Sequence, residues 1–134
     1  MHTLATQFLT AKLYAHRAHH LVSGPTFFAD HAFLGDLYNA YDAAYDDLIE
    51  QMIGLGVSPD IIAITGSAYN AFAKAKLDTK PEQFFKTLIN MERQIQASIK
   101  RLVPGATDGT ANLLQGLAQD SEKRANYKMQ QRVS

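Results

Sequence analysis

Cysteine and tryptophan are both absent from the 134 residues of the chain. The absence of cysteine excludes disulfides and thiolate metal sites, so imidazole and carboxylate groups are the only strong metal-binding side chains left. A chain without cysteine suits a reducing compartment, and we expect a cytoplasmic protein.

Charge of one sign is not in excess either, because thirteen lysine and arginine residues balance thirteen aspartate and glutamate residues. A neutral chain has no overall field that would attract nucleic acid or an anionic membrane, although this does not exclude a local patch. Net charge therefore does not indicate the class of partner.

Long hydrophobic runs are missing too. No stretch approaches the roughly 18 apolar residues of a membrane-spanning helix. The first residues also lack the basic segment and unbroken apolar segment of a signal peptide. We expect a soluble, uncleaved chain with no membrane partner. Its length and its 46% hydrophobic content are typical of one domain, residues 1–134, with one core.

Apolar residues recur with nearly helical periodicity over residues 3–22, and the sequence SGP at 23–25 ends this pattern. A longer helix is predicted over residues 26–55, where neither proline nor a strong turn cluster occurs. Its apolar residues cover more than a single stripe, which indicates that more than one face is buried and points to a partner subunit.

Residues 56–80 form a connection that is too long for a hairpin loop, and we expect a crossover carrying a short helix. A capping box at Thr79–Glu82 predicts the start of a third long helix, which Pro104 and Gly105 end. The last helix begins at about Asp108 or Thr110. Its expected inward residues are Leu113, Leu114, Leu117, Ala118 and Tyr127. These elements predict an all-α protein, a four-helix bundle in the ferritin-like arrangement.

Four of the five histidines lie close together in the sequence, at His16, His19, His20 and His31. His19 precedes Gly24 by five residues and His31 follows it by seven, so the two lie at similar heights on opposite arms of an antiparallel hairpin. They could share a ligand. Each histidine by itself is more often a hydrogen-bonded core or surface residue than a metal ligand.

Acidic residues recur on the second helix at Asp42, Asp46 and Glu50, a spacing that places their carboxylates along one face. A solvated acidic edge is the plain alternative. His31 and Asp46 are fifteen residues apart on one helix, which separates them by roughly 22 Å. One subunit therefore cannot bring the histidines and these carboxylates to one metal ion.

A two-fold dimer would close this gap. If the second helix lies antiparallel to its mate and crosses it near Asn39 and Ala40, His31 of one chain lies opposite Asp46 and Glu50 of the other. Such an interface is isologous and creates two equivalent sites. Small residues near the crossing would permit close approach, namely Gly35, Ala40, Ala43 and Ala44.

The spacing of these residues resembles that of the Dps proteins, or mini-ferritins, the DNA-binding proteins from starved cells. The matching positions are His19, Gly24, Phe27, Phe28, His31, Asp46, Glu50 and the closing Leu55–Gly56. A weaker resemblance continues through the third helix and into residues 108–123. It spans nearly the whole chain, and its specific part is residues 19–56.

The resemblance implies a hollow dodecamer of two-fold dimers with an iron-oxidising ferroxidase centre at each dimer interface. His19 and His31 of one subunit and Asp46 and Glu50 of its mate would be the ligands. Fe(II) would be oxidised by hydrogen peroxide or oxygen and stored inside as ferric mineral. The same ligands could hold zinc or manganese.

The chain departs from the family in several places. His20 and Tyr127 stand where many relatives have tryptophan, so radical quenching would fall to tyrosines such as Tyr14 or Tyr127. Many relatives have an acidic residue at the position of Gly35. Asp36 is adjacent, but its side chain points about 100° away around the helix.

Features outside the proposed centre carry weaker signals. DNA binding is not expected, because the first helix begins almost at Met1 and leaves no room for the family's lysine-rich arm.

Asp108 and Asp120 are the candidates for an acidic pore, and a solvated helix end is the commoner role of such residues. The basic cluster Lys123, Arg124, Lys128 and Arg132 is expected to be a solvated last turn that complements the helix dipole.

His16 and His20 are four residues apart on the first helix and could bind a second metal ion, but nothing acidic nearby completes such a site, which favours a surface role. Two non-enzymatic functions stay open: a DNA-condensing assembly, and a structural helical-bundle oligomer with a vestigial metal site. An ordinary di-iron bundle is disfavoured, because no glutamate is followed by histidine three residues later.

Overall fold

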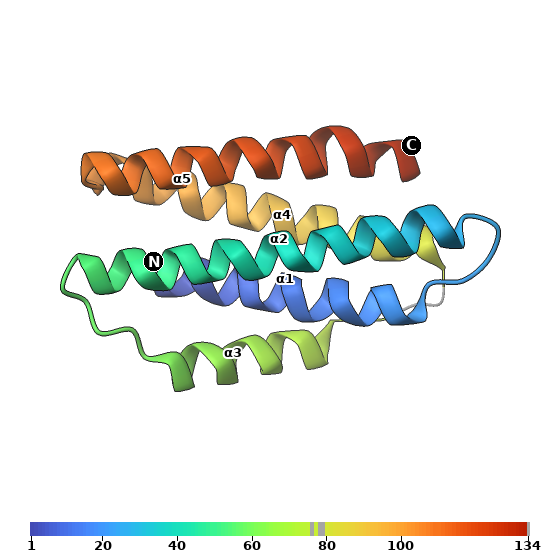
Figure 1. The fold of residues 1–134 in the computed structure, drawn as a ribbon, viewed down its shortest axis with the longest axis horizontal. Helices are drawn as coiled ribbons and strands as arrows, with labels where there is room; N and C mark the ends of the chain where they lie inside the picture. The colour runs from blue at the N-terminus through green and yellow to red at the C-terminus, as the bar shows by residue number, and fades with distance from the viewer. Residues whose placement is uncertain (76, 78–79, 134) are drawn as a thin grey trace.

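The computed structural model describes residues 1–75, 77 and 80–133. Over these residues the chain is helical, without a strand. Four long helices form a bundle in which helices joined by short connections are antiparallel (Figure 1). They are α1 (His2–Leu21), α2 (Phe27–Gly54), α4 (Pro81–Leu102) and α5 (Asp108–Ser121). None of the helices in this part of the chain is long and apolar enough to cross a bilayer.

Glycines with left-handed backbone angles mark both ends of α2. Gly24 has a φ of 97° in the turn from α1 to α2, and Gly56 has a φ of 83° just after α2. Residues with a Cβ rarely adopt these angles, so glycine permits both sharp changes of direction. The predicted bundle is confirmed, and so are the starts of its four helices and the ends of the first three, to within two residues.

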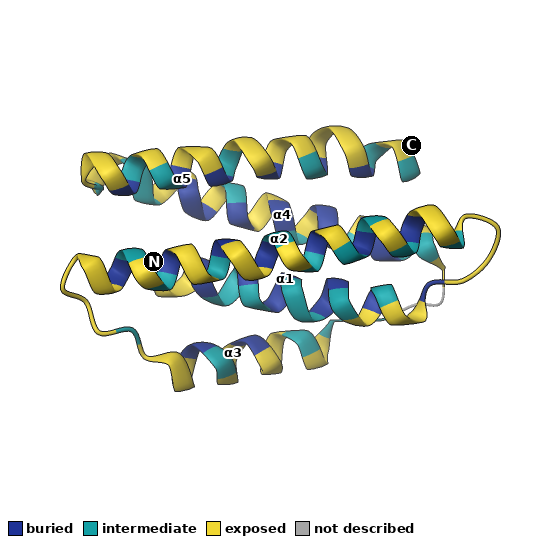
Figure 2. Cartoon of the chain, viewed as in Figure 1, coloured by how far each residue is buried: buried dark blue, intermediate teal, exposed yellow. Residues whose placement is uncertain are grey.

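The crossover between α2 and α4 contains α3 (Ile61–Lys74), as predicted. The Asp60 side chain caps this helix by accepting a hydrogen bond from the Ala63 N–H at 3.0 Å. α3 lies outside the bundle along α1 (Figure 1). It buries Ile64 and Ala68, while most of its other residues are exposed (Figure 2).

The capping box predicted at the start of α4 includes a residue that the structure does not describe. Thr79 lies outside the described residues, and the residue before α4 is Lys80, whose side chain makes no capping hydrogen bond. Pro81 is the first residue of α4, where its missing N–H costs no helical bond. α5, in contrast, has a side-chain cap: Thr107 Oγ1 accepts a hydrogen bond from the Thr110 N–H at 3.3 Å.

The last helix changes its hydrogen-bonding pattern after Ser121. A π-helical segment, η2 (Glu122–Lys128), follows α5, and a short 3-10 helix, η3 (Met129–Arg132), follows η2. A π-helix has more residues per turn than an α-helix. The side chains after it therefore point in other directions than they would on a continuous α-helix. Ala125 and Met129 are buried, whereas Tyr127 is 67% exposed. The prediction that Tyr127 points inward is wrong: Ala125 and Met129 on either side of it face the core, and Tyr127 lies on the outer side of η2.

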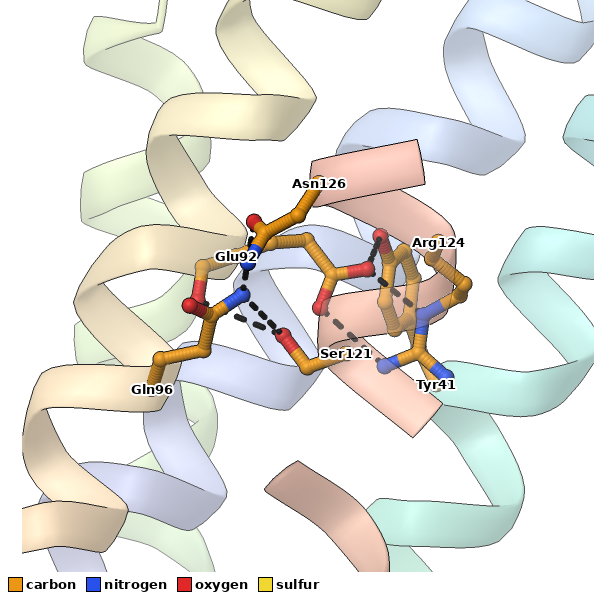
Figure 3. Close-up of polar contacts among 6 residues, drawn as sticks. All are labelled: Tyr41, Glu92, Gln96, Ser121, Arg124 and Asn126. Carbon is orange, nitrogen blue, oxygen red and sulfur yellow. Dashed lines mark hydrogen bonds and ion pairs between the residues drawn. The ribbon is translucent and has the colours of Figure 1, made fainter. Parts of the chain in front are cut away.

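A carboxylate lies in the middle of the bundle, where the side chain of Glu92 on α4 is fully buried. Arg124 on η2 donates from Nε to Glu92 Oε2 at 2.6 Å and from Nη2 to Oε1 at 3.0 Å. Tyr41 on α2 donates its hydroxyl to Oε2 at 2.9 Å (Figure 3). One buried acid therefore joins α2, α4 and η2.

The surroundings of this ion pair stabilise its charges. Burial and the neighbouring Glu92 carboxylate raise the pKa of Tyr41 well above its usual value, so the phenol stays protonated and keeps donating. Burial alone would lower the pKa of Arg124, but the hydrogen bonds and charge of Glu92 raise it overall. The guanidinium also lies over the Tyr41 ring, 5.2 Å from its centroid.

A second ion pair joins the start of α2 to the end of the chain. Arg132 donates to both carboxylate oxygens of buried Asp30, at 3.0 and 2.8 Å. Thr26 donates its hydroxyl to Asp30 Oδ2 at 2.6 Å. Burial would raise the pKa of Asp30, but hydrogen bonds from Arg132 and Thr26 lower it overall. This pair holds the helical turn that contains His31.

The Arg124→Met variant should lose about 3–5 kcal/mol of unfolding free energy, because it leaves the buried Glu92 carboxylate without its cation. Urea unfolding at fixed protein concentration measures the loss. Lys123→Met is the matched control, since Lys123 is exposed, and it should change stability by no more than about 0.5 kcal/mol. Glu92→Gln in the Arg124→Met background should restore part of the loss. No gain from that second substitution would contradict the role of the charge.

The Asp30→Asn variant should be about 1–2 kcal/mol less stable than the parent at pH 7, because Arg132 is partly exposed and solvent screens the pair. The folded pKa of Asp30 is lowered. Its contribution is therefore present above the unfolded value of about 3.9 and is lost as pH falls through the folded value. The difference in unfolding free energy between parent and variant should stay constant from pH 7 to about pH 4 and shrink as pH falls further. The exposed control Asp47→Asn should not show this convergence.

Candidate metal centre

His19 and His31 meet where α1 and α2 come together at the Gly24 turn. Their rings are stacked, with centroids 3.7 Å apart and planes inclined by 18°. His19 lies in the last turn of α1 and His31 in the second turn of α2. The structure thus brings together the two histidines that the sequence placed at similar heights.

Each of these histidines is bound to the backbone of the other. His19 Nδ1 lies 2.7 Å from the His31 carbonyl oxygen, and His31 Nδ1 lies 2.8 Å from the His19 carbonyl oxygen. A carbonyl oxygen can only accept, so both Nδ1 atoms carry the hydrogen. In the neutral rings, each Nε2 keeps a free lone pair. This arrangement is the one that orients a histidine for metal ligation through Nε2.

Gly35 makes room for this contact. It lies one helical turn after His31 on α2, and a Cβ at this position would lie 3.2 Å from His19 Cε1 and 3.4 Å from His19 Nδ1. Any larger residue would press on the imidazole at the point where it approaches the His31 carbonyl. Gly35 therefore allows close contact between the two helices at this point.

Other aromatic rings surround the pair. Phe27 stacks on the outer side of His31 with centroids 4.9 Å apart. Tyr38 lies edge-on to His19 at 5.4 Å and stacks on His16 at 4.1 Å. The sequence analysis did not select Tyr38, although it is seven residues after His31 and so lies two helical turns away on the same face of α2. Tyr38 is a tyrosine in direct contact with these histidines.

His16 lies one turn before His20 on the same helix. Desolvation and the charges of His20, His19 and Lys12 lower the pKa of His16, so its neutral form is favoured at pH 7. Of the two neighbouring histidines on α1, His20 is the closer: its ring centroid is 4.6 Å from that of His16, against 6.3 Å for His19. The structure therefore holds four imidazoles in one continuous group.

The stacking of His19 and His31 limits how they can bind metal. An imidazole ligates an ion in the plane of its own ring, and these planes are nearly parallel at 18°. An ion in the plane of one ring lies outside the plane of the other. Without ring rotation the pair suits two neighbouring ions better than one shared ion.

The predicted acidic ligands lie further along α2. Asp46 and Glu50 are exposed, and neither makes an ion pair or hydrogen bond within the described residues. Asp42, in contrast, is paired with Lys12 at 3.0 Å. The residues expected as ligands are therefore the two members of the acidic triplet whose carboxylates are unpaired.

These carboxylates do not reach the histidines within one chain. α2 is continuous from Phe27 to Gly54, so His31 and Asp46 are separated by roughly 22 Å along its axis. In the described part of the chain, no three histidine, aspartate or glutamate side chains converge on one point. A complete site with the predicted ligands requires a second subunit.

Two members of the predicted basic cluster are not free in solvent but are paired with buried acids. Arg124 is bound to buried Glu92 inside the bundle, and the partly exposed Arg132 is bound to buried Asp30. The expectation of a solvated basic turn therefore holds only for the exposed Lys123 and Lys128. The signal for both ion pairs was present in the sequence: Glu92 and Asp30 each fall on the apolar stripe of their helix, where an acid needs a partner.

The remaining candidate residues are scattered. Asp108 and Asp120 are exposed near opposite ends of α5. Tyr14 is buried in the core against Phe84, with ring centroids 6.4 Å apart. Tyr127 is exposed on η2. None of these positions adds a ligand to the histidine pair.

Known proteins share this fold. A model of the ferritin-like domain family matches residues 2–130, almost the whole chain. The structure of Dps from Listeria monocytogenes superposes with a TM-score of 0.76 at 20% sequence identity, covering 92% of this chain and 86% of that one. Comparison with curated protein sequences gives no match. The chain therefore belongs to the ferritin-like family, and its fold is that of the Dps-type mini-ferritins.

Proposed function

We propose that this chain is an iron-oxidising and iron-storing mini-ferritin. Two chains would form ferroxidase centres at their two-fold interface, and two-fold dimers would assemble into a hollow cage of twelve. His19 and His31 of one subunit and Asp46 and Glu50 of its mate are the proposed ligands. The observation that carries the proposal is the reciprocal histidine pair, which leaves both Nε2 atoms free.

The surface of α2 supports a dimer. At about 100° per residue, the proposed ligands of α2 fall within one sector of roughly 100° around the helix axis. This sector also contains two large exposed apolar residues, Phe28 at 86% and Ile53 at 58%. The opposite side of α2 is buried in the core through Leu34, Tyr41 and Leu48. The outward side of α2 thus combines polar ligands with apolar side chains that a partner would cover.

An antiparallel crossing near Asn39 and Ala40 aligns these features. Residue 31 of one chain then lies opposite residue 48 of the other, between Asp46 and Glu50. Phe28 likewise lies opposite residue 51, close to Ile53. A single two-fold axis would therefore bury both exposed apolar residues and complete two metal sites, as an isologous interface must.

The ligands suit the chemistry. Neutral imidazole and carboxylate bind Fe(II), and the carboxylates stabilise the additional charge of Fe(III). Each ferrous ion loses one electron, so one hydrogen peroxide molecule accepts electrons from two ions and, with two protons, yields two water molecules. Oxygen is the alternative oxidant. Zinc or manganese could occupy the same ligands, and we place the protein in the cytoplasm.

The double variant His31→Ala, Asp46→Ala should oxidise Fe(II) with peroxide at least about tenfold more slowly than the parent, because each centre loses a ligand from both subunits. Stopped-flow absorbance of the ferric product measures the rate. The control His2→Ala, Asp47→Ala removes the same residue types at exposed positions and should keep the parental rate. Equal rates in all three proteins would refute the proposed centre.

Light scattering tests the assembly separately. Twelve chains of 14.8 kDa give a particle of about 178 kDa. A monomer or an isolated dimer in solution would contradict the cage, even if iron is oxidised.

The Gly35→Ala variant should slow Fe(II) oxidation by up to about tenfold, because the new methyl group displaces the His19 imidazole from the His31 carbonyl. Its stability should not fall in parallel, since alanine in a helix interior is favoured over glycine by up to about 1 kcal/mol. Gly116→Ala is the control, because no atom lies within 4 Å of a Cβ at that position. Unchanged oxidation in Gly35→Ala would show that the close contact is not needed.

A further inference from the structure

Two imidazoles next to the proposed iron centre have no part in it. His16 and His20 are one helical turn apart on α1, and their ring centroids are 4.6 Å apart. They share a face of α1 with His19, whose ring centroid is 6.3 Å from that of His16 and 5.7 Å from that of His20. Three of the four neighbouring imidazoles thus come from one helix.

The nitrogen atoms of these two rings are available. Neither His16 nor His20 makes a hydrogen bond or ion pair with any other described residue, in contrast to His19 and His31, whose Nδ1 atoms are bound to carbonyls. His16 is held in place by stacking on Tyr38, with planes inclined by only 15°. His20 is exposed to solvent. One ring is therefore fixed and the other can adjust.

The separation of the rings fits chelation. Two metal–nitrogen bonds of about 2.0–2.1 Å at an angle between about 90° and 110° place imidazole centroids roughly 4.5–5.2 Å apart. The observed separation is 4.6 Å. The stacked pair His19 and His31, with centroids 3.7 Å apart, is too close for this geometry. The two histidine pairs therefore differ in what they can do.

We propose that His16 and His20 form a second metal site, which binds an imidazole-seeking divalent cation of the Zn²⁺ class with water in the remaining positions. A donor set of nitrogen alone favours zinc, nickel and copper over magnesium, calcium and manganese. Histidines four residues apart on one helix face are a known zinc-binding arrangement. The absence of a nearby acid does not prevent such binding, since neutral imidazole is itself the ligand.

Zinc binding by the assembled protein tests the site. The starting protein carries Asp46→Asn and Glu50→Gln, which remove the carboxylates of the proposed iron centre. Isothermal titration with Zn²⁺ should then show a site that His20→Gln weakens at least about tenfold, because one of two ligands is lost. His16→Gln should have the same effect. His2→Gln, which removes a histidine outside the group, should leave the affinity unchanged.

Crystals soaked in Zn²⁺ locate the ion. Anomalous density at the zinc edge should lie between the rings of His16 and His20. Unchanged zinc affinity in both His16→Gln and His20→Gln, or density only at His19 and His31, would overturn the proposal. If His16→Gln disturbs the packing on Tyr38, the exposed His20→Gln decides the outcome. If the parent protein does not oxidise Fe(II), the proposed function is contradicted. The zinc titration still tests the site at His16 and His20, because it does not depend on iron oxidation.

Discussion

The buried carboxylate of Glu92 is the constraint on which the bundle depends. A charged group with no access to water must be paired and hydrogen-bonded, or its burial costs several kcal/mol. Arg124 and Tyr41 satisfy both oxygen atoms from two other segments of the chain. The π-helical turn at Glu122–Lys128 is the segment that supplies this arginine. One acid and its partners therefore link α2, α4 and the end of the chain.

This internal pair also affects where metal chemistry can occur. In the middle of the bundle, the buried Glu92 carboxylate is already paired with Arg124. The imidazoles and carboxylates that have no such partner lie outside the packed core. The histidine pair lies at the hairpin end of α1 and α2, and the unpaired Asp46 and Glu50 lie on the outward side of α2. α2 thus has two functions: its buried side holds the bundle, and its exposed side carries the residues proposed to bind iron between subunits.

Much of the fold could be predicted from the sequence. The signals that predicted it act locally: the apolar periodicity and the residues Gly24, Gly56 and Pro81. They predicted the helices, most of their ends and the short helix of the crossover. The prediction failed where a distant residue decided the conformation. Arg124 and Arg132 are paired with acids on α4 and α2, and the segment that carries Arg124 leaves Tyr127 exposed.

For the candidate site, the sequence by itself determined that His19 and His31 face each other and that Asp46 lies too far along the same helix. Both follow from residue spacing on regular helices. Only the tertiary structure decided which nitrogen of each imidazole is free, why Gly35 stands beside His19, and which carboxylates are left unpaired. Those properties depend on contacts at the ångström scale between side chains and backbone of different helices. Residue spacing on one helix carries no information about such contacts.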